Sequence, residues 1–322
     1  MPLVTDALGR LQEIAGLRIS TGVPLAPYTR FGIGGPAALF AESASAESFA
    51  LALAVVRESN LRHAVISCGT NLIVSDYGFD GIVLRFTGER LQLKGMRLTV
   101  EAGALLQTLV DTTIASNLQG IESMTGIPGS LGAAIYGNAG AYGTSIDKHI
   151  ERVWFTDGAT TSSLTGAECE FEYRGSVFKN RKEWIILSAV LSFRAGDRLE
   201  LQKRATEIRT IRDAKYPPTM RCAGSIFKNC IFSKLPAHVQ AEVPPSLVRH
   251  DKVPSAWFLE QIGAKGLTRG DIKVAGYHAN LIYNDGDGTA ADLVAVISDL
   301  KARVFDRFGF SIEEEVQYVG FD

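Results

Sequence analysis

The chain lacks both an excess of one charge and any long apolar run. Its 322 residues carry 33 Lys and Arg against 35 Asp and Glu, which leaves a formal net charge of −2. This balance gives no electrostatic reason to expect binding to nucleic acid or to an anionic membrane. No apolar run approaches the roughly 18 residues of a membrane span, and residues 1–6 show no signal-peptide pattern. We therefore expect a cytoplasmic protein with neither a membrane nor a nucleic-acid partner.

Cysteine and histidine are scarce and scattered. The four cysteines are Cys68, Cys169, Cys222 and Cys230; none forms a CxxC pair, and their spacing fits no zinc motif. The five histidines include no HExxH pattern. We therefore expect no protein-bound catalytic metal, and we expect the cysteines to be free thiols of a reducing compartment.

Several well-known motifs are also missing. The sequence has no GxxxxGKS or GxxxxGKT, which excludes a P-loop, and no GxSxG, which argues against a serine hydrolase. It also has no GxGxxG that follows a strand, opens a helix and precedes an acidic residue. A doubly wound dinucleotide-binding fold is therefore unsupported.

What the chain does have is a dense cluster of glycine at residues 126–143, called the glycine strip below. Six of the 32 glycines fall in these 18 positions, which contain no charged residue. Glycine loses the most backbone entropy on folding, so such density indicates either positive φ angles or a ligand lying against the main chain. The alternative is a linker or a run of turns, but Ile127, Leu131 and Ile135 are too apolar for a flexible linker. The composition favours a large ligand that is partly anionic and partly planar.

Two shorter glycine-bearing loops lie upstream, at residues 32–35 and 69–75. Successive backbone N–H groups in such turns form nests that bind pyrophosphate oxygens. The side chains of Asn71, Ser75 and Asn138 can add hydrogen bonds to the ligand. Each loop alone can be purely structural, but three together suggest a ligand as long as a dinucleotide.

Hydrophobic periodicity predicts an α+β chain without internal repeats. We expect helices at 44–59, 105–116, 199–214 and 289–308, and strands at 64–67, 81–86, 98–102, 153–156, 160–164, 184–194, 272–275, 281–284 and 310–321. The apolar stripe of the helix at 199–214 should be Leu201, Ala205, Ile208 and Ile211. Residues 216–218, Tyr-Pro-Pro, end this helix and form the best candidate linker.

Six sequence blocks share one resemblance, in order along nearly the whole chain. They are residues 29–35 (TRFGIGG), 69–76 (GTNLIVSD), 126–143, 173–179 (YRGSVFK), 223–229 (AGSIFKN) and 314–316 (EEV). Together they resemble the UDP-N-acetylenolpyruvoylglucosamine reductases (UDP-N-acetylmuramate dehydrogenases), flavoproteins that complete the muramic acid unit of bacterial peptidoglycan. Any one block would be weak evidence, whereas six in the same order are specific.

The resemblance implies an α+β fold of the vanillyl-alcohol-oxidase type, with two FAD-binding subdomains and a smaller α+β substrate-binding domain. We expect the subdomains at 1–77 and 78–217 and the substrate-binding domain at 218–309, with the strand at 310–322 returning to the active site. The connection from Lys179 to the strand at 184–194 is short. The chain therefore resembles the second type of the family, which lacks a tyrosine-bearing lid loop.

By the same resemblance, the three glycine loops hold FAD. The FAD is expected to be non-covalent, because no histidine lies in the loop at 69–75. The expected FAD-binding residues are Arg30, Gly69, Thr70, Asn71, Leu72, Ile73, Ser75, Ile127, Pro128, Gly129, Ser130, Gly132, Ala133, Asn138, Gly140, Ala141 and Tyr142. The expected substrate-binding residues are Tyr173, Lys215, Lys228 and Asn229, whereas His278 and Asn280 are at least as easily explained as supports of the fold.

The resemblance also implies the reaction, which is the NADPH-dependent reduction of UDP-N-acetyl-3-O-(1-carboxyvinyl)glucosamine to UDP-N-acetylmuramate. NADPH reduces FAD and leaves before the sugar nucleotide enters the same cleft. The enol ether accepts hydride at its terminal carbon, so negative charge develops on the adjacent carbon and spreads into the carboxylate. The site must stabilise that charge and supply one proton.

Three residues match the catalytic positions of the family. Ser225 is expected to protonate the carbanion, Arg174 to hold the carboxylate or support the serine, and Glu315, if protonated, to donate to the developing aci-carboxylate. A serine hydroxyl is a weak acid, so it needs a preorganised field, which Lys228 and Arg174 can supply. Glu313 lies two residues from Glu315 on the same face of the expected strand and would favour the protonated form of Glu315 if water is excluded.

Two positions depart from the family pattern, and two alternative functions stay open. Cys230 stands where the family usually has proline, and Cys68 where it usually has glycine; we expect altered loop stiffness or pocket shape and no lost chemistry. The alternatives are another FAD-dependent oxidase or dehydrogenase on the same scaffold, and a non-catalytic flavin-binding module. We further expect a monomer whose partner is the small-molecule substrate.

Overall fold

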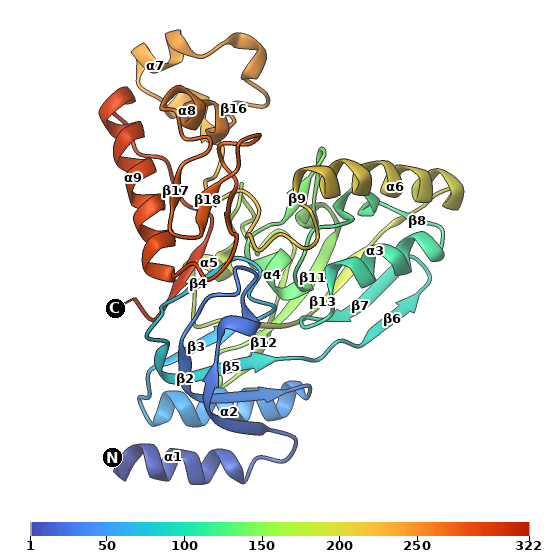
Figure 1. Cartoon of the computed structure of the whole chain (residues 1–322). Helices are drawn as coiled ribbons and strands as arrows, with labels where there is room; N and C mark the ends of the chain where they lie inside the picture. The colour runs from blue at the N-terminus through green and yellow to red at the C-terminus, as the bar shows by residue number, and fades with distance from the viewer. Residues whose placement is uncertain (1, 322) are drawn as a thin grey trace. The chain divides into compact units, whose positions relative to one another are not determined.

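A computed structural model describes residues 2–321 of the chain (Figure 1). The chain folds into two compact units, each assembled from segments that are far apart in sequence. Unit 1 contains the residues up to Val23 together with Ala37–Cys68 and Asp80–Pro217. Unit 2 contains Pro24–Pro36, Gly69–Phe79 and the residues from Pro218 onward. The three-domain division inferred from the sequence stays a prediction.

The first sheet of unit 1 has four strands in the order β1-β2-β5-β3. The strands are β1 (Arg18–Pro24), β2 (Pro36–Ser43), β3 (His63–Ile66) and β5 (Phe79–Phe86), and β3 pairs with β5 in parallel. Helix α2 (Ala46–Glu58) links β2 to β3 and begins at the cap Ser45, whose side chain accepts a hydrogen bond from the Ser48 N–H. Helix α1 (Pro2–Gln12) lies along α2 (Figure 1).

The second sheet of unit 1 is antiparallel and has the order β12-β11-β13-β7-β6. Its strands are β6 (Leu91–Lys94), β7 (Arg97–Glu101), β11 (Ile150–Thr156), β12 (Thr161–Thr165) and β13 (Ile185–Ser192). Helices α3 (Leu106–Ala115) and α6 (Arg198–Lys215) contact each other in the same unit (Figure 1). Short elements complete it: β8 (Leu118–Gln119), α4 (Leu131–Tyr136), β9 (Gly140–Ala141), β10 (Thr144–Ser145), α5 (Val177–Asn180) and β14 (Arg194–Ala195).

Unit 2 is built around the long helix α9 (Ala290–Phe308). Thr289 caps its first turn, and Gly309 ends it with a φ of +72°. The helix contacts β17 (Thr268–Arg269) and β18 (Ile272–Val274), which form a three-stranded sheet with β19 (Ile282–Asn284). The other elements are β4 (Leu72–Val74), β15 (Cys230–Ile231), α7 (Ala237–Glu242), β16 (Lys252–Val253), α8 (Ser255–Gln261) and β20 (Gln317–Val319). Strand β20 pairs with β4 in parallel.

The four expected helices and most of the expected strands are confirmed within a few residues, whereas three interpretations were wrong. The C-terminal strand covers Gln317–Val319 instead of 310–321. Ile211 is 55% exposed, so the buried stripe of α6 is Leu201, Ala205 and Ile208. The glycine strip contains a helix, α4, and is not loop throughout. Helix α1 and strands β1 and β2 were not predicted. Among the described residues, no helix has the length and apolarity needed to cross a membrane.

Candidate functional site

The glycine strip in unit 1 is partly a packed structure. Ser130 caps α4, its Oγ accepting a hydrogen bond from the Ala133 N–H, and the same Oγ lies 2.6 Å from Ser67 Oγ. A Cβ placed at Gly132 would lie 3.0 Å from the Ala102 Cβ, closer than an ordinary van der Waals contact. Close packing therefore explains part of the glycine density, and a ligand is not needed at Gly132.

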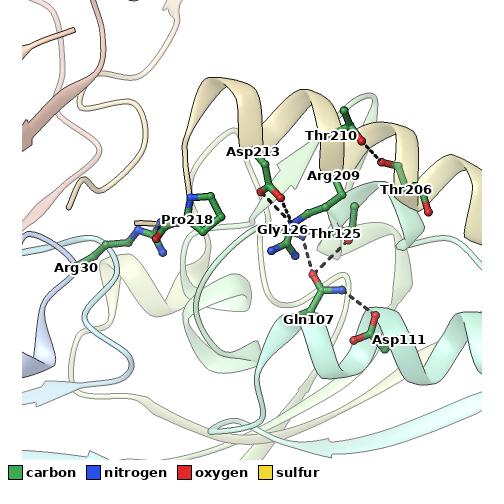
Figure 2. A network of polar contacts seen from close by, with 10 residues as sticks. All are labelled: Arg30, Gln107, Asp111, Thr125, Gly126, Thr206, Arg209, Thr210, Asp213 and Pro218. Atoms are coloured by element: carbon green, nitrogen blue, oxygen red, sulfur yellow. Dashed lines mark hydrogen bonds and ion pairs between the residues drawn. The ribbon is translucent and has the colours of Figure 1, made fainter. Parts of the chain in front are cut away.

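Gln107 of α3 holds the beginning of the glycine strip (Figure 2). Its Oε1 accepts hydrogen bonds from the Gly126 N–H at 2.7 Å and from the Thr125 hydroxyl at 3.3 Å. Its Nε2 donates to Asp111 Oδ1 at 2.8 Å. Gly126 adopts a φ of +73°, so this side chain fixes a turn that favours glycine. The sequence patterns gave no sign of Gln107.

Replacing Gln107 with alanine should loosen this turn. The Gly126 N–H and the Thr125 hydroxyl would lose their acceptor, which should lower the free energy of unfolding by about 1 kcal/mol and weaken FAD retention. Denaturant unfolding and the FAD content after dialysis measure the two effects. The control is Asp111→Ala, which removes only the exposed partner of the Gln107 amide. Equal FAD loss in the two variants would contradict this role of Gln107.

Arg212 of α6 brings a desolvated cation to the same turn. Its Nε is buried and forms no hydrogen bond within residues 2–321, and it would lie 3.3 Å from a Cβ at Gly126. Burial lowers the pKa of its guanidinium, an effect that the nearby Tyr142 partly opposes. Ser123 Oγ is a second buried atom without a hydrogen bond in the described part of unit 1. Because unsatisfied buried polar groups are costly, this turn fits a bound ligand with anionic or electron-rich atoms.

Arg174 and Tyr173, predicted for catalysis and substrate binding, lie beside the glycine strip in unit 1. Both Nη atoms of Arg174 donate to the Gly140 carbonyl at 3.4 Å, and the guanidinium lies 5.4 Å from the centre of the Tyr173 ring. Arg174 has a φ of +58°, uncommon for a residue with a side chain. Lys179 Nζ donates to the Arg174 carbonyl at 3.0 Å and so supports this backbone conformation. Strained backbone of this kind is frequent at functional sites.

Two other predicted residues of unit 1 interact with the protein itself. Asn138 Nδ2 donates to the Glu172 carbonyl at 3.0 Å, and its Oδ1 accepts from the Asp147 N–H at 3.4 Å. Lys215 Nζ lies 5.0 Å from the centre of the Tyr216 ring at the end of α6. The amide of Asn138 therefore already bonds to the protein through both of its polar atoms.

In unit 2, the loop at residues 69–71 presents backbone donors. The N–H groups of Gly69, Thr70 and Asn71 donate no hydrogen bond within the described chain. Gly69 has a φ of +61°, and a Cβ there would lie 1.7 Å from the Tyr28 carbonyl oxygen, so only glycine fits. The Asn71 side chain, which was expected to bond to the ligand, donates to the Glu315 carbonyl at 2.8 Å. Three successive N–H groups without an internal acceptor fit the pyrophosphate of FAD.

The glycines at 34 and 35 have a structural explanation. A Cβ at Gly35 would lie 2.3 Å from the Asp76 carbonyl oxygen, and one at Gly34 would lie 2.9 Å from the Val74 Cβ. The Asp76 carboxylate in turn accepts hydrogen bonds from the N–H groups of Ala290 and Ala291 at 2.8 and 2.9 Å, so it caps α9. Close backbone packing thus requires these glycines, whatever the ligand.

The remaining predicted FAD residues lie in or next to these segments. In unit 2, the Arg30 backbone N–H donates to the Gly69 carbonyl at 3.4 Å. The Arg30 side chain donates to the Pro218 carbonyl, also at 3.4 Å (Figure 2). The Ile73 side chain is buried in the core of this unit, and the Ser75 carbonyl accepts from the Gly35 N–H. The other predicted residues are placed by their elements: Leu72 lies in β4, Ala133 in α4 and Ala141 in β9, and Ile127, Pro128 and Gly129 lie just before α4.

Ser225 and Glu315 are brought to neighbouring segments of unit 2. The Glu315 N–H donates to the Ile226 carbonyl at 2.7 Å, and the Lys228 N–H donates to the Glu313 carbonyl at 2.9 Å. Residues 226–228 and 313–315 therefore run antiparallel, although 85 or more positions separate them in the sequence. The structure places the predicted proton donor and the predicted carboxylic acid on adjoining backbone.

Glu313 does not meet the condition, exclusion of water, under which it was expected to favour the protonated form of Glu315. Its side chain is 75% exposed and accepts a hydrogen bond from Lys228 Nζ at 2.8 Å. Its charge is therefore both solvated and paired. Water is therefore not excluded at Glu313 in the chain alone. The expected effect, in which Glu313 favours the protonated form of Glu315, depended on that exclusion.

Cys230 is a neutral packing group next to this segment. Burial raises the pKa of its thiol to about 11, and its Sγ lies 3.7 Å from the hydroxyl of Ser255. That hydroxyl also donates to the Lys228 carbonyl. All four cysteines are free thiols. Asn229 lies between Lys228 and β15.

Comparison with known proteins agrees with this geometry. Residues 216–319 match the C-terminal domain model of UDP-N-acetylenolpyruvoylglucosamine reductase, and residues 37–160 match an FAD binding domain. A UDP-N-acetylenolpyruvoylglucosamine reductase of Solibacter usitatus is 53% identical over 97% of this chain and all of its own length. One from Carboxydothermus hydrogenoformans is 33% identical over 97% of this chain and 98% of its own.

A solved structure gives the same result. The crystal structure of the UDP-N-acetylenolpyruvylglucosamine reductase of Thermus caldophilus superimposes with a TM-score of 0.72 at 27% identity, and the match covers 94% of this chain and 98% of that one. The expected α+β fold with an FAD-binding part and a smaller C-terminal domain is confirmed. The chain belongs to the UDP-N-acetylenolpyruvoylglucosamine reductase family.

Proposed function

We propose that this chain reduces UDP-N-acetyl-3-O-(1-carboxyvinyl)glucosamine to UDP-N-acetylmuramate with electrons from NADPH, in peptidoglycan precursor synthesis. Family membership supports the reaction. The observation that carries the assignment of the site is the antiparallel pairing of residues 226–228 with 313–315, which brings Ser225 and Glu315 to adjoining backbone. We further propose that the enzyme works as a monomer in the cytoplasm.

The chain has the donors that an FAD site needs. We propose that the backbone N–H groups of residues 69–71 bind the pyrophosphate of FAD. We also propose that the glycine strip and Arg212 contribute to FAD binding. When bound and reduced by NADPH, FAD would supply hydride to the terminal carbon of the enol ether.

The protein has to stabilise one negative charge and deliver one proton. We propose that the Ser225 hydroxyl protonates the carbon next to the ether oxygen, with Lys228 providing positive charge nearby. Glu315, when protonated, donates to the carboxylate on which charge develops, and the Arg174 guanidinium binds that carboxylate. Tyr173, Lys215 and Asn229 are proposed to bind the sugar nucleotide.

The experiment that tests this function is the visible spectrum of the purified protein. The protein should be yellow, should bleach with NADPH, and should regain its colour anaerobically when the enolpyruvyl sugar nucleotide is added. UDP-N-acetylglucosamine, which lacks the enol ether, is the control and should leave the flavin reduced. Recolouring by air alone, with no response to the enolpyruvyl substrate, would overturn the proposal in favour of an oxidase.

A further inference from the structure

The side chain of Asn280 makes the hydrogen bonds that a neighbouring strand would otherwise make. It lies between β18 and β19 in unit 2 and is 3% exposed. Its Oδ1 accepts from the Phe227 N–H at 2.9 Å, and its Nδ2 donates to the Phe227 carbonyl at 2.8 Å. The Asn280 carbonyl also accepts from the Ile226 N–H at 3.2 Å. One side-chain amide therefore satisfies both backbone groups of a single residue.

Phe227 lies just two residues after Ser225, on a segment that belongs to no regular strand. One edge of this segment pairs with residues 313–315. The other edge bonds to Asn280, and an isolated bridge joins Ser225 to Leu281, the residue just before β19. Phe227 is 1% exposed, so water cannot replace the hydrogen bonds from Asn280. The amide of Asn280 therefore helps to fix the position of this segment, which carries Ser225, together with the pairing to residues 313–315 and the bridge to Leu281.

We infer that Asn280 is a positioning residue for Ser225. The inference rests on the proposed function, in which the Ser225 hydroxyl delivers a proton to the substrate. A proton donor has to lie within hydrogen-bond reach of the reacting atom, and a displacement of about 1 Å can cost about a hundredfold in rate. Asn280 makes no contact of its own with the reacting atoms in this proposal, and it acts through the backbone of Phe227.

The test is Asn280→Asp in the full-length flavoprotein. The carboxylate keeps an acceptor for the Phe227 N–H but replaces the donor to the Phe227 carbonyl with a second acceptor. Reoxidation of the reduced flavin by the enolpyruvyl sugar nucleotide should slow about a hundredfold, while reduction by NADPH keeps its rate. If Asn280→Asp does not fold, Asn280→Ser, which is neutral and too short to pair with both groups of Phe227, should show the same separation.

The structure offers a matched control in Asn284. It is also 3% exposed and lies in the same unit, where its Nδ2 donates to the Phe31 carbonyl at 3.0 Å and its Oδ1 accepts from the Gly288 N–H at 3.0 Å. Asn284→Asp should therefore destabilise the unit in a similar way without slowing reoxidation selectively. A selective slowing of the same size in Asn284→Asp would overturn the inference, because it would attribute the effect to general loosening.

A double variant, Asn280→Asp with Ser225→Ala, tests the positioning role of Asn280 separately from the proton-donor role of Ser225. If Asn280 acts through Ser225, adding Asn280→Asp to Ser225→Ala should slow reoxidation no further. Full additivity, or normal reoxidation in Asn280→Asp while Ser225→Ala is slow, would overturn the role of Asn280 alone. Normal reoxidation in Ser225→Ala would instead overturn the proposed role of Ser225.

Discussion

Replacing Ser225 with alanine should separate the two halves of the reaction. NADPH should still bleach the flavin at the wild-type rate, because hydride transfer from NADPH needs no proton from Ser225. Reoxidation by the enolpyruvyl sugar nucleotide should slow about 10²–10⁴-fold, the usual contribution of a general acid. Anaerobic stopped-flow absorbance, with NADPH in one experiment and the sugar nucleotide in the other, measures both rates.

The control for this prediction is Ser233→Ala. Ser233 lies in the same unit, is exposed and donates to Asp251 Oδ2 at 2.6 Å. Its loss should change neither half-reaction, and both variants should retain FAD and unfold near the wild-type temperature. Reoxidation of Ser225→Ala at the wild-type rate would contradict the assignment of Ser225 as the proton donor.

The parts of the fold that could be predicted are those determined by local sequence. Helix α9 is the clearest case, because its cap Thr289, its buried stripe and the stop at Gly309 all lie within one continuous segment. The hairpin of β11 and β12 is another, since Asp157-Gly158 connects two strands that pair directly. Each signal is complete without knowledge of any distant residue.

The C-terminal segment shows why other parts could not be predicted. Ile312 and Val316 are buried, in keeping with the alternation that suggested one strand over 310–321. Yet Glu314 forms a bridge with Phe227, whereas Gln317–Val319 pairs with β4. Two partners from distant parts of the chain share the segment, so no continuous strand forms. Sequence periodicity reports burial, and it cannot report a change of partner.

The sequence singled out candidate residues for the site, and their roles stay predictions; the side chains that hold the backbone next to them could not be predicted. The family blocks pointed to Ser225 and Glu315, and the structure places both on adjoining backbone. Asn71 was expected to bind FAD and Asn280 to support the fold, but no pattern indicated that their amides bond to the backbone of Glu315 and Phe227. Gln107, which bonds to the Gly126 N–H, was not singled out at all. An amide that replaces a strand partner has no characteristic spacing, because its partner is a backbone group elsewhere in the chain.

Replacing Gly69 with alanine should have a large effect, because two separate constraints exclude a side chain at this position. Its φ is +61°, which costs about 1–2 kcal/mol for a residue with a Cβ. A Cβ would also lie 1.7 Å from the Tyr28 carbonyl oxygen, so backbone would have to move. Gly69→Ala should therefore lower the free energy of unfolding by about 2–5 kcal/mol, since forced repacking adds to the cost of the φ angle.

Movement of this loop should also release the cofactor. The N–H groups of residues 69–71 are the proposed pyrophosphate donors, and Asn71 in the same loop donates to the Glu315 carbonyl. Gly69→Ala should therefore purify with little FAD and show weak recovery when FAD is added. Flavin absorbance after gel filtration and thermal unfolding with and without added FAD measure both effects.

The matched control for Gly69→Ala is Gly263→Ala in the same unit. Gly263 has a similar φ of +68°, but a Cβ there would meet no atom within 4 Å. Gly263→Ala should therefore lower the free energy of unfolding only by the cost of the positive φ angle, about 1–2 kcal/mol, and FAD should stay bound. The difference between the two variants then measures the overlap with Tyr28. Equal stability and equal FAD content in both would show that the loop relaxes freely, and the close approach to Tyr28 would then not explain why glycine occupies position 69.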